Sequence, residues 1–318
     1  MDGETMNDVQ GDGDAGSAPP LPGVGELIVV GLPGAFSQWG VSLIREMLAA
    51  AGSASAVVLL HQAPALGYPR EQGSRCVVLL DEPDRALAEL TAQGMEPMAA
   101  TRHLTAWLAP LPGLLGEPGT FLVARAALAD MAALRSGLAA HLLPHGPWPD
   151  GAMAAESAID ATAPGPQLSG QALALARQVL RPMAEHAAGR RGVPIVWPLT
   201  CFYAGDHLDE VAPPLVDVVG PARVLYYGPY FHLPAGNWRV DVQFFCSETL
   251  AGALLGVEIF SDRELARASV RPSHGGLFQA SFPLVTQRPE ERIEARIWLL
   301  AGVLDGQLGL RQVVFQPV

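Results

Sequence analysis

The chain contains no lysine, so all 20 of its basic residues are arginine. This absence excludes a phosphate-binding lysine, a Schiff-base lysine and a lysine general base. Acidic residues outnumber basic ones, which gives a formal net charge of −12 at pH 7, and no run of basic residues occurs. Binding to nucleic acid or to an anionic membrane surface is therefore not expected.

Cysteine is scarce as well. Cys76, Cys201 and Cys246 are odd in number, widely separated and in no CxxC pair. This arrangement favours a reducing compartment over a disulfide framework. A cytoplasmic location is the expectation that follows.

The sequence has no long uninterrupted apolar run. Residues 1–25 are acidic, lack the basic and apolar regions of a signal peptide, and are predicted to form a disordered tail. The most apolar helical stretch, residues 121–143, contains Arg125, Asp130 and Arg135. Membrane insertion is not expected for a stretch interrupted in this way.

Motifs for metal binding and for hydrolysis are also missing. His141 and His145 are four residues apart, but Pro144 ends the helix that would align them. No GxSxG, HExxH or EF-hand pattern occurs. The sequence therefore predicts neither a metal nor a cofactor. His61, at the end of a predicted strand, and His103 are the candidate general bases.

The best-defined stretch that is present, ELIVVGLPGAFSQWGVSLIREMLAAAG over residues 26–52, indicates a buried strand, a glycine-rich turn and an amphipathic helix. Ser37 is predicted to cap that helix. Further apolar runs at 56–60, 76–80 and 120–123 alternate with helical segments, and Asp81 is predicted to cap the second helix. The alternation predicts a P-loop-like α/β domain with a parallel sheet over residues 26–200, including a linker-like segment at 144–170.

From about Gly220 the apolar period changes from helical to two. In residues 237–245, Trp238, Val240, Val242 and Phe244 share one face of a predicted strand. Further strands are predicted at 223–231, 254–260, 264–270, 277–285, 292–300 and 308–315. The fold class is thus α/β plus all-β, with an antiparallel jelly-roll-like sandwich over residues 220–318.

The turn GLPGAFSQW resembles the 5′-phosphosulfate loop of the sulfotransferase family, whose pattern is close to G-x-P-R-S-G-T-T-W. Gly31, Pro33, Ser37 and Trp39 match that pattern. Three of its positions differ here: the basic residue is Gly34, the inner glycine is Phe36 and the second threonine is Gln38. The resemblance implies a phosphate loop that has lost its positive charge.

The segment VVLLDEPDRALAEL resembles the 3′-phosphate segment of the same family. Pro83 is kept, but the phosphate-binding arginine is replaced by Asp81 and the serine by Glu89. Carboxylates at a phosphate site repel the nucleotide by several kcal/mol, on the order expected for like charges a few ångströms apart. The resemblance therefore implies a degenerate site that rejects the sulfonucleotide.

The predicted sandwich offers a different candidate site. Its polar strand positions include Arg239, Asp241 and Gln243 on one strand, Glu258 on a second, and Arg296 with Trp298 on a third. Planar donors and acceptors beside an exposed ring suit the hydroxyls and the C–H face of a sugar. An ordinary solvated sheet face explains the same pattern equally well.

The segment YYGPYFHLPAGNW, residues 226–238, resembles the first strand of jelly-roll domains appended to bacterial glycan-handling proteins. The prediction is a non-catalytic or pseudo-enzymatic protein whose sandwich binds a glycan or a partner protein. Two alternatives stay open: a divergent transferase that uses another donor, with His61 or His103 as base, and a structural subunit that forms an oligomer.

Overall fold

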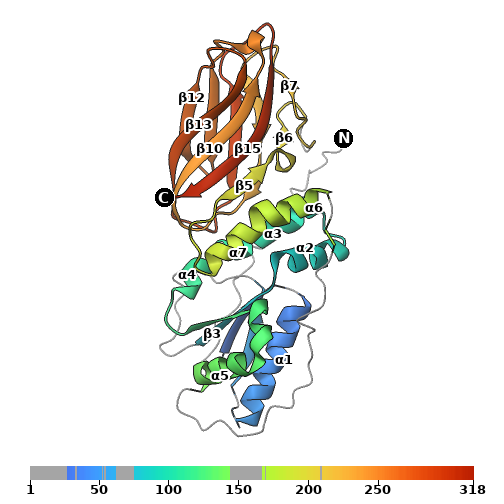
Figure 1. The fold of residues 1–318 in the computed structure, drawn as a ribbon, viewed down its shortest axis with the longest axis vertical. Helices are drawn as coiled ribbons and strands as arrows, with labels where there is room; N and C mark the ends of the chain where they lie inside the picture. Colours follow the sequence, from blue (N-terminus) through green and yellow to red (C-terminus); the bar gives the residue numbers. More distant parts are fainter. Residues whose placement is uncertain are drawn as a thin grey trace, which may run out of the picture.

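The computed structural model of the chain describes residues 27–32, 34–51, 53, 55–61, 75–143, 167–168, 170–207 and 210–318. The predicted acidic tail and most of the predicted linker lie outside these residues. The described chain forms an α/β part and a β-sandwich, stacked along the long axis of the molecule (Figure 1).

A four-stranded parallel sheet forms the centre of the α/β part. Its order is β2-β1-β3-β4, with every neighbouring pair parallel. The strands are β1 (Leu27–Gly31), β2 (Val57–Leu60), β3 (Arg75–Leu80) and β4 (Thr120–Ala124). The central strands β1 and β3 are almost wholly buried, because helices cover both faces of the sheet. The strands predicted from apolar runs are confirmed.

Two helical layers enclose this sheet. One face carries α1 (Ala35–Ala50) and α5 (Met131–Leu142). The other carries α2 (Pro83–Ala92), α3 (Pro97–Leu108), α4 (Leu111–Leu115), α6 (Gly170–Leu175) and α7 (Arg181–Ala187), with a π-helical turn at Ala176–Leu180 between the last two. The second helix of the first layer, α5, begins only at Met131, because residues 125–130 form a 3₁₀ turn and Asp130 caps α5 through the amide of Ala133.

The β-sandwich consists of two antiparallel sheets. One has the order β13-β10-β15-β5, with β7 on β15, and the other the order β12-β11-β14-β8-β6, with β9 on β14. Their strands are β5 (Ile195–Pro198), β6 (Tyr203–Ala204), β7 (Val216–Asp217), β8 (Arg223–Tyr227), β9 (Pro229–Phe231), β10 (Gly236–Cys246), β11 (Leu255–Phe260), β12 (Glu264–Val270), β13 (Gly276–Thr286), β14 (Ile293–Leu299) and β15 (Gln307–Pro317). A 3₁₀ turn lies at Leu199–Cys201 and another at Glu248–Leu250.

The seven strands predicted from period-two patterns are confirmed, although the first is broken at Gly228 into β8 and β9. The side chains predicted to share the inward face of β10 are all buried. The sandwich nevertheless starts before Gly220. β5 follows α7 directly and pairs with β15, so residues that the sequence assigned to the α/β domain belong to this sheet.

The layer of α2, α3, α6 and α7 lies between the parallel sheet and the sandwich (Figure 1). One continuous apolar core runs through it and joins Leu104 of α3 to Trp197 of β5 and Phe231 of β9. The hydroxyl of Thr105 in α3 accepts a hydrogen bond from the backbone N–H of His232, at 3.3 Å. The two parts are therefore packed through a shared layer rather than joined by a bare linker. Among the described helices, none combines the length and the apolarity needed to cross a bilayer.

Candidate functional site

The turn that resembles a phosphate loop is occupied by the protein's own carboxylate. β1 ends at Gly31, Pro33 lies outside the described residues, and α1 begins after Gly34. Oε2 of Glu89, from α2, lies 3.3 Å from the backbone nitrogen of Ala35. A Cβ atom on Gly34 would lie 2.1 Å from the same oxygen. The helix N-terminus that would receive a phosphate thus receives Glu89 instead.

The rest of the turn is filled by side chains of α1. Ser37 does not cap the helix as predicted, because α1 begins two residues earlier and buries it; a Cβ atom on Gly31 would lie 2.4 Å from its Oγ. Phe36 and Trp39 are buried and stack with ring centroids 5.4 Å apart, whereas Gln38 points to solvent. The turn is a packed strand-to-helix connection, and the resemblance to the sulfotransferase loop stays a prediction.

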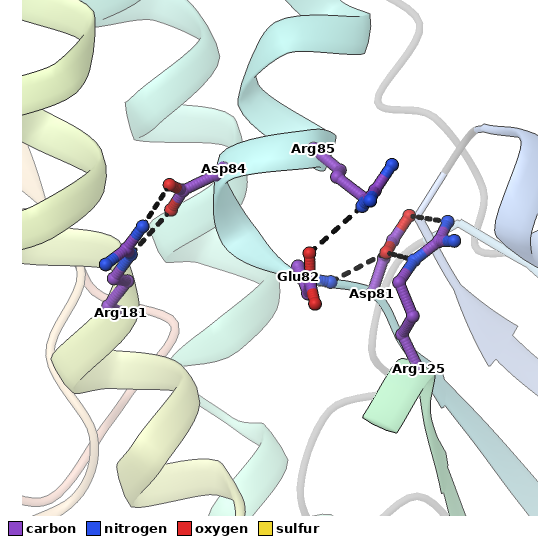
Figure 2. A network of polar contacts seen from close by, with 6 residues as sticks. All are labelled: Asp81, Glu82, Asp84, Arg85, Arg125 and Arg181. Atoms are coloured by element: carbon purple, nitrogen blue, oxygen red, sulfur yellow. Dashed lines mark hydrogen bonds and ion pairs between the residues drawn. The ribbon is translucent and has the colours of Figure 1, made fainter. Parts of the chain in front are cut away.

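Asp81 has a different role from the predicted helix cap. Both of its carboxylate oxygens accept hydrogen bonds from Arg125 of the next strand end, and Oδ1 also accepts from the N–H of Glu82 (Figure 2). Both side chains of this pair are at least nine-tenths buried. The bonded Asp81 carboxylate raises the pKa of Arg125, while α2 starts at Pro83 without a side-chain cap.

A cleft of about 490 Å³ lies beside this pair, between the carboxyl ends of β3 and β4 and helix α7. Its guanidinium groups already have carboxylate partners: Arg125 with Asp81, Arg181 with Asp84 at 2.8 Å, and Arg190 with Glu185 at 3.7 Å. Figure 2 shows the first two pairs on either side of the start of α2. A phosphate entering this cleft would have to displace an internal carboxylate.

The two candidate bases are near enough for the charge of one to affect the pKa of the other. His61, after β2, has its Nδ1 3.0 Å from the carbonyl oxygen of Gly31. His103 projects from α3, and burial together with the nearby charge of His61 lowers its pKa. Its Nε2 is buried without a hydrogen-bond partner in the described part of the chain. A catalytic role for the two histidines stays a prediction.

No cluster of metal-ligating side chains occurs among the described residues. The three cysteines are buried and form no disulfide. Burial raises the pKa of Cys246 to about 11 and that of Cys201 further still. Neither of these two thiols is suited to act as a nucleophile.

The polar residues predicted on the sandwich do not form one site. Arg239, Asp241 and Gln243 lie on β10, in the sheet that ends with β5 and β13. Glu258 and the pair Arg296 and Trp298 lie on β11 and β14, in the opposite sheet. Both sets alternate with buried residues, so they face outward in opposite directions. The sequence predicted the alternation but not the sheet to which each strand belongs.

The outer face of the first sheet carries a ladder of glutamines. Nε2 of Gln312 donates to Gln243 at 3.0 Å, and Nε2 of Gln243 donates to Gln279 at 3.2 Å, so the amides cross three strands in order. Arg239 folds over Asp241, with Nη2 3.1 Å from Oδ2. Asp241, a predicted binding residue, is 5% exposed. This face is polar: its glutamines bond to one another, and Oδ1 of Asp241 is buried without a hydrogen-bond partner among the described residues.

The outer face of the second sheet carries a row of side chains that we name the aromatic–carboxylate strip, made of Tyr230, Glu294, Arg296, Glu258 and Trp298. Arg296 stands at its centre, 2.7 Å from Glu294 and 3.5 Å from Glu258. Tyr230 donates its hydroxyl to Glu294 at 3.3 Å, and Trp298 donates its indole N–H to Glu258 at 3.2 Å. Each carboxylate is thus held between the arginine and an aromatic donor.

Burial distinguishes the members of the strip. Glu258 and Glu294 are 9% and 5% exposed, whereas Arg296 and Trp298 are partly exposed. The guanidinium of Arg296 also stacks on Phe260, with its carbon 3.9 Å from the ring centroid. The carboxylates therefore fix the positions of the ring and guanidinium groups that reach solvent. Two buried carboxylates share one arginine, which leaves the strip with a net negative charge.

The sequence did not predict the tyrosine end of the strip, which is Tyr230 together with its neighbours Tyr203 and Tyr227. Tyr203 of β6 pairs with Tyr227 of β8, their ring centroids 5.4 Å apart, and Tyr230 lies beside them with its backbone at φ 66°. Positive φ is rare for a bulky residue. Burial and the neighbouring Glu294 raise the pKa of Tyr230 to about 12. The predicted binding residues did not include the tyrosines of the segment YYGPY.

A residue of the α/β part completes this end. Arg102 of α3 donates from Nε to the carbonyl oxygen of Pro229 at 2.9 Å and from Nη2 to the hydroxyl of Tyr203. Its guanidinium carbon lies 5.6 Å from the ring centroid of Tyr203 and 5.8 Å from that of Tyr230. No pattern within α3 indicates this contact, because it depends on how the two parts pack.

Comparison with known proteins identifies no family for the chain. No family model matches the sequence. No curated protein matches it either.

Among solved structures, the sandwich is similar to carbohydrate-binding domains. One is the CBM36-1 domain of a multidomain xylanase from the hindgut metagenome of Trinervitermes trinervoides, with TM-score 0.27 and 5% identity over 40% of this chain and 98% of that chain. Another is the xylan-binding module CBM86 from Roseburia intestinalis, with TM-score 0.26 and 14% identity over 40% and 97%. A third is TmCBM61 in complex with beta-1,4-galactotriose, with TM-score 0.26 and 13% identity over 41% and 92%. The likeness is too low to assign a function to this chain.

Proposed function

We propose that the β-sandwich binds a glycan across the aromatic–carboxylate strip and that the α/β part serves as a non-catalytic scaffold. The observation that carries the proposal is Arg296, which two buried carboxylates hold between the rings of Tyr230 and Trp298. The strip thus presents rings and a guanidinium group whose positions are fixed before a ligand arrives. Fixed positions lower the entropic cost of binding.

The chemistry of the strip suits a sugar. A pyranose has a C–H face that stacks on an aromatic ring, and hydroxyls that accept hydrogen bonds from planar N–H groups. Trp298 and the tyrosines supply rings, and Arg296 supplies N–H donors between them. The opposite face of the sandwich offers no comparable set, because the amides of the glutamine ladder bond to each other.

The filled turn supports a scaffold role for the α/β part. Glu89 occupies the N-terminus of α1, and Phe36 and Trp39 fill the position beside it. A transferase with another donor remains the second candidate, because His61 is near enough to His103 for its charge to lower the pKa of His103. Release of a transferred group from a labelled nucleotide sugar, abolished by His103→Gln, would favour the transferase over the scaffold.

The test of the proposal is a glycan array probed with the full chain, followed by calorimetry on the best ligand. Trp298→Ala and Arg296→Gln are expected to lower affinity at least about tenfold, the effect of losing one ring or one charged donor. Gln279→Ala, on the outer face of the opposite sheet, is the matched control and should leave affinity unchanged. No array signal, together with a stable oligomer in light scattering, would favour a structural subunit instead.

A further inference from the structure

We infer that the glycan carries one acidic sugar, whose carboxylate is bound by Arg102 at the tyrosine end of the aromatic–carboxylate strip. This inference rests on the proposed function. It adds a residue of the α/β part to the binding site and selects a chemical class of ligand, a glycan in which a uronic-acid residue adjoins neutral sugars.

Arg102 is a guanidinium group without a carboxylate partner among the described residues. Its hydrogen bonds go to a backbone carbonyl and to a tyrosine hydroxyl, neither of which is a carboxylate. Most other arginines whose contacts are described form ion pairs, including Arg125, Arg181 and Arg296. A fixed and partly exposed cation of this kind favours an anion in its neighbourhood.

The surroundings of Arg102 point to a sugar as the carrier of that anion. Its guanidinium group lies against the rings of Tyr203 and Tyr230. The hydroxyl of Tyr230 in turn contacts Glu294 of the strip. One tyrosine side chain therefore connects Arg102 to the proposed site, and a ligand that stacks on the tyrosines reaches both. Tyr230 keeps its unfavourable backbone conformation at this junction, as residues of binding sites often do.

The charges along the strip favour a carboxylate of the ligand only at the tyrosine end, next to Arg102. Glu294 and Glu258 share the single Arg296, so the centre of the strip repels an anion. The chain as a whole has a net charge of −12 and also disfavours polyanions. A glycan with a carboxylate on every residue would place one of them over the two glutamates. A single acidic residue beside neutral ones avoids this repulsion and fixes the orientation of the ligand.

The experiment compares each acidic ligand with its own neutral counterpart. Disaccharides ending in glucuronic, galacturonic or mannuronic acid are placed on an array beside the same disaccharides after reduction of the carboxyl group to an alcohol. The best pair is then measured by calorimetry with the full chain at two salt concentrations. We expect the acid to bind about tenfold more tightly than its reduced form, with a preference that shrinks as salt rises.

Arg102→Gln is expected to abolish the preference and to keep the affinity for the reduced ligand. Arg296→Gln is expected to lower the affinity for the acid and for the reduced ligand by the same factor, because Arg296 is proposed to bind the sugar hydroxyls of both. Equal binding of each acid and its reduced form by the unaltered chain overturns this inference and leaves the proposed function standing. Binding of neither class, to these or to any other glycan, overturns both. Since the comparison of ligands uses the unaltered chain, it decides the matter even if Arg102→Gln does not fold.

Discussion

Glu89 places a carboxylate oxygen 3.3 Å from the backbone nitrogen of Ala35, at the start of α1. This contact joins α2 to the N-terminus of α1 across the turn after β1. A negative charge is favourable at that point because the first N–H groups of a helix have no partner inside the helix. The protein thus satisfies internally a position that other folds leave open for an anion.

Removal of this carboxylate is expected to destabilise the fold without creating a nucleotide site. Glu89→Ala should lower the free energy of unfolding by about 1 kcal/mol, measured by urea denaturation. Glu46→Ala, at an exposed position of α1, is the control and should have little effect. Neither variant should bind 3′-phosphoadenosine 5′-phosphosulfate in calorimetry. Tight binding by the unaltered chain would contradict the scaffold role of this domain.

The buried pair Arg125 and Asp81 gives a second prediction. Asp81→Asn or Arg125→Met alone leaves one charge buried without its partner and should cost about 3–5 kcal/mol in urea denaturation. The double variant Asp81→Asn with Arg125→Met removes both charges, and its free energy of unfolding should fall by much less than the sum of the two single losses. Additive losses in this double-mutant cycle would show that the two side chains do not act as a pair.

The contrast between Asp81 and β10 shows which features a sequence pattern can predict: burial along one strand, but not a contact between distant segments. Trp238, Val240, Val242 and Phe244 were placed on the buried face correctly, because period-two alternation is a local property of one strand. Asp81 looked like a helix cap because its partner, Arg125, comes from a distant strand end. Local spacing cannot specify which segments meet across a sheet.

In the candidate site, too, local sequence patterns predict individual strand positions but not which segments meet. Glu258, Arg296 and Trp298 were found by alternation, and the structure groups them. Their tyrosine neighbours lie on the short strands β6 and β9, which are too brief to show a period. Arg102 lies on a helix of the other part. It therefore depends on domain packing, about which the sequence gives no local signal.

Acid is expected to destabilise the protein through its buried histidines. Burial lowers the pKa of His103, His141, His186 and His232. The unfolded chain then binds protons below its ordinary pKa of about 6.5 while the folded protein does not, so folding stability falls as the pH drops below that value. The melting temperature should decrease from pH 7 to pH 5. His103→Gln should make the melting temperature depend less on pH. If the pH dependence is unchanged by this substitution, other groups cause it.

Tyr230 allows stability and binding to be separated. Tyr230→Gly relieves the positive φ at that position, a gain on the order of 1 kcal/mol that partly offsets the loss of ring contacts. Glycan affinity should nevertheless fall at least about tenfold, because the ring and its hydroxyl bond to Glu294 are both lost. Tyr230→Phe, which keeps the ring, should retain most of the affinity. A larger loss from the phenylalanine variant than from the glycine variant would contradict a stacking role.

The shared helical layer predicts one thermal transition for the α/β part and the sandwich. Leu104, Trp197 and Phe231 belong to one apolar core, so unfolding either part exposes surface of the other. Scanning calorimetry should show a single peak whose van't Hoff and calorimetric enthalpies agree. Leu104→Ala should lower the transition temperature without splitting it, whereas two separated peaks would show that the parts unfold independently.

The position of β5 determines the order in which the chain can fold. β5 follows α7 in the sequence, yet within the described sheet it pairs with β15, which is synthesised after all the other described strands. Trp197 of β5 packs against Phe315 of that strand, with ring centroids 4.4 Å apart. During synthesis the α/β part can be complete while this tryptophan still lacks its neighbour. The nascent chain therefore exposes an apolar, aggregation-prone segment next to the α/β part. This exposure ends only when β15 has been synthesised and pairs with β5.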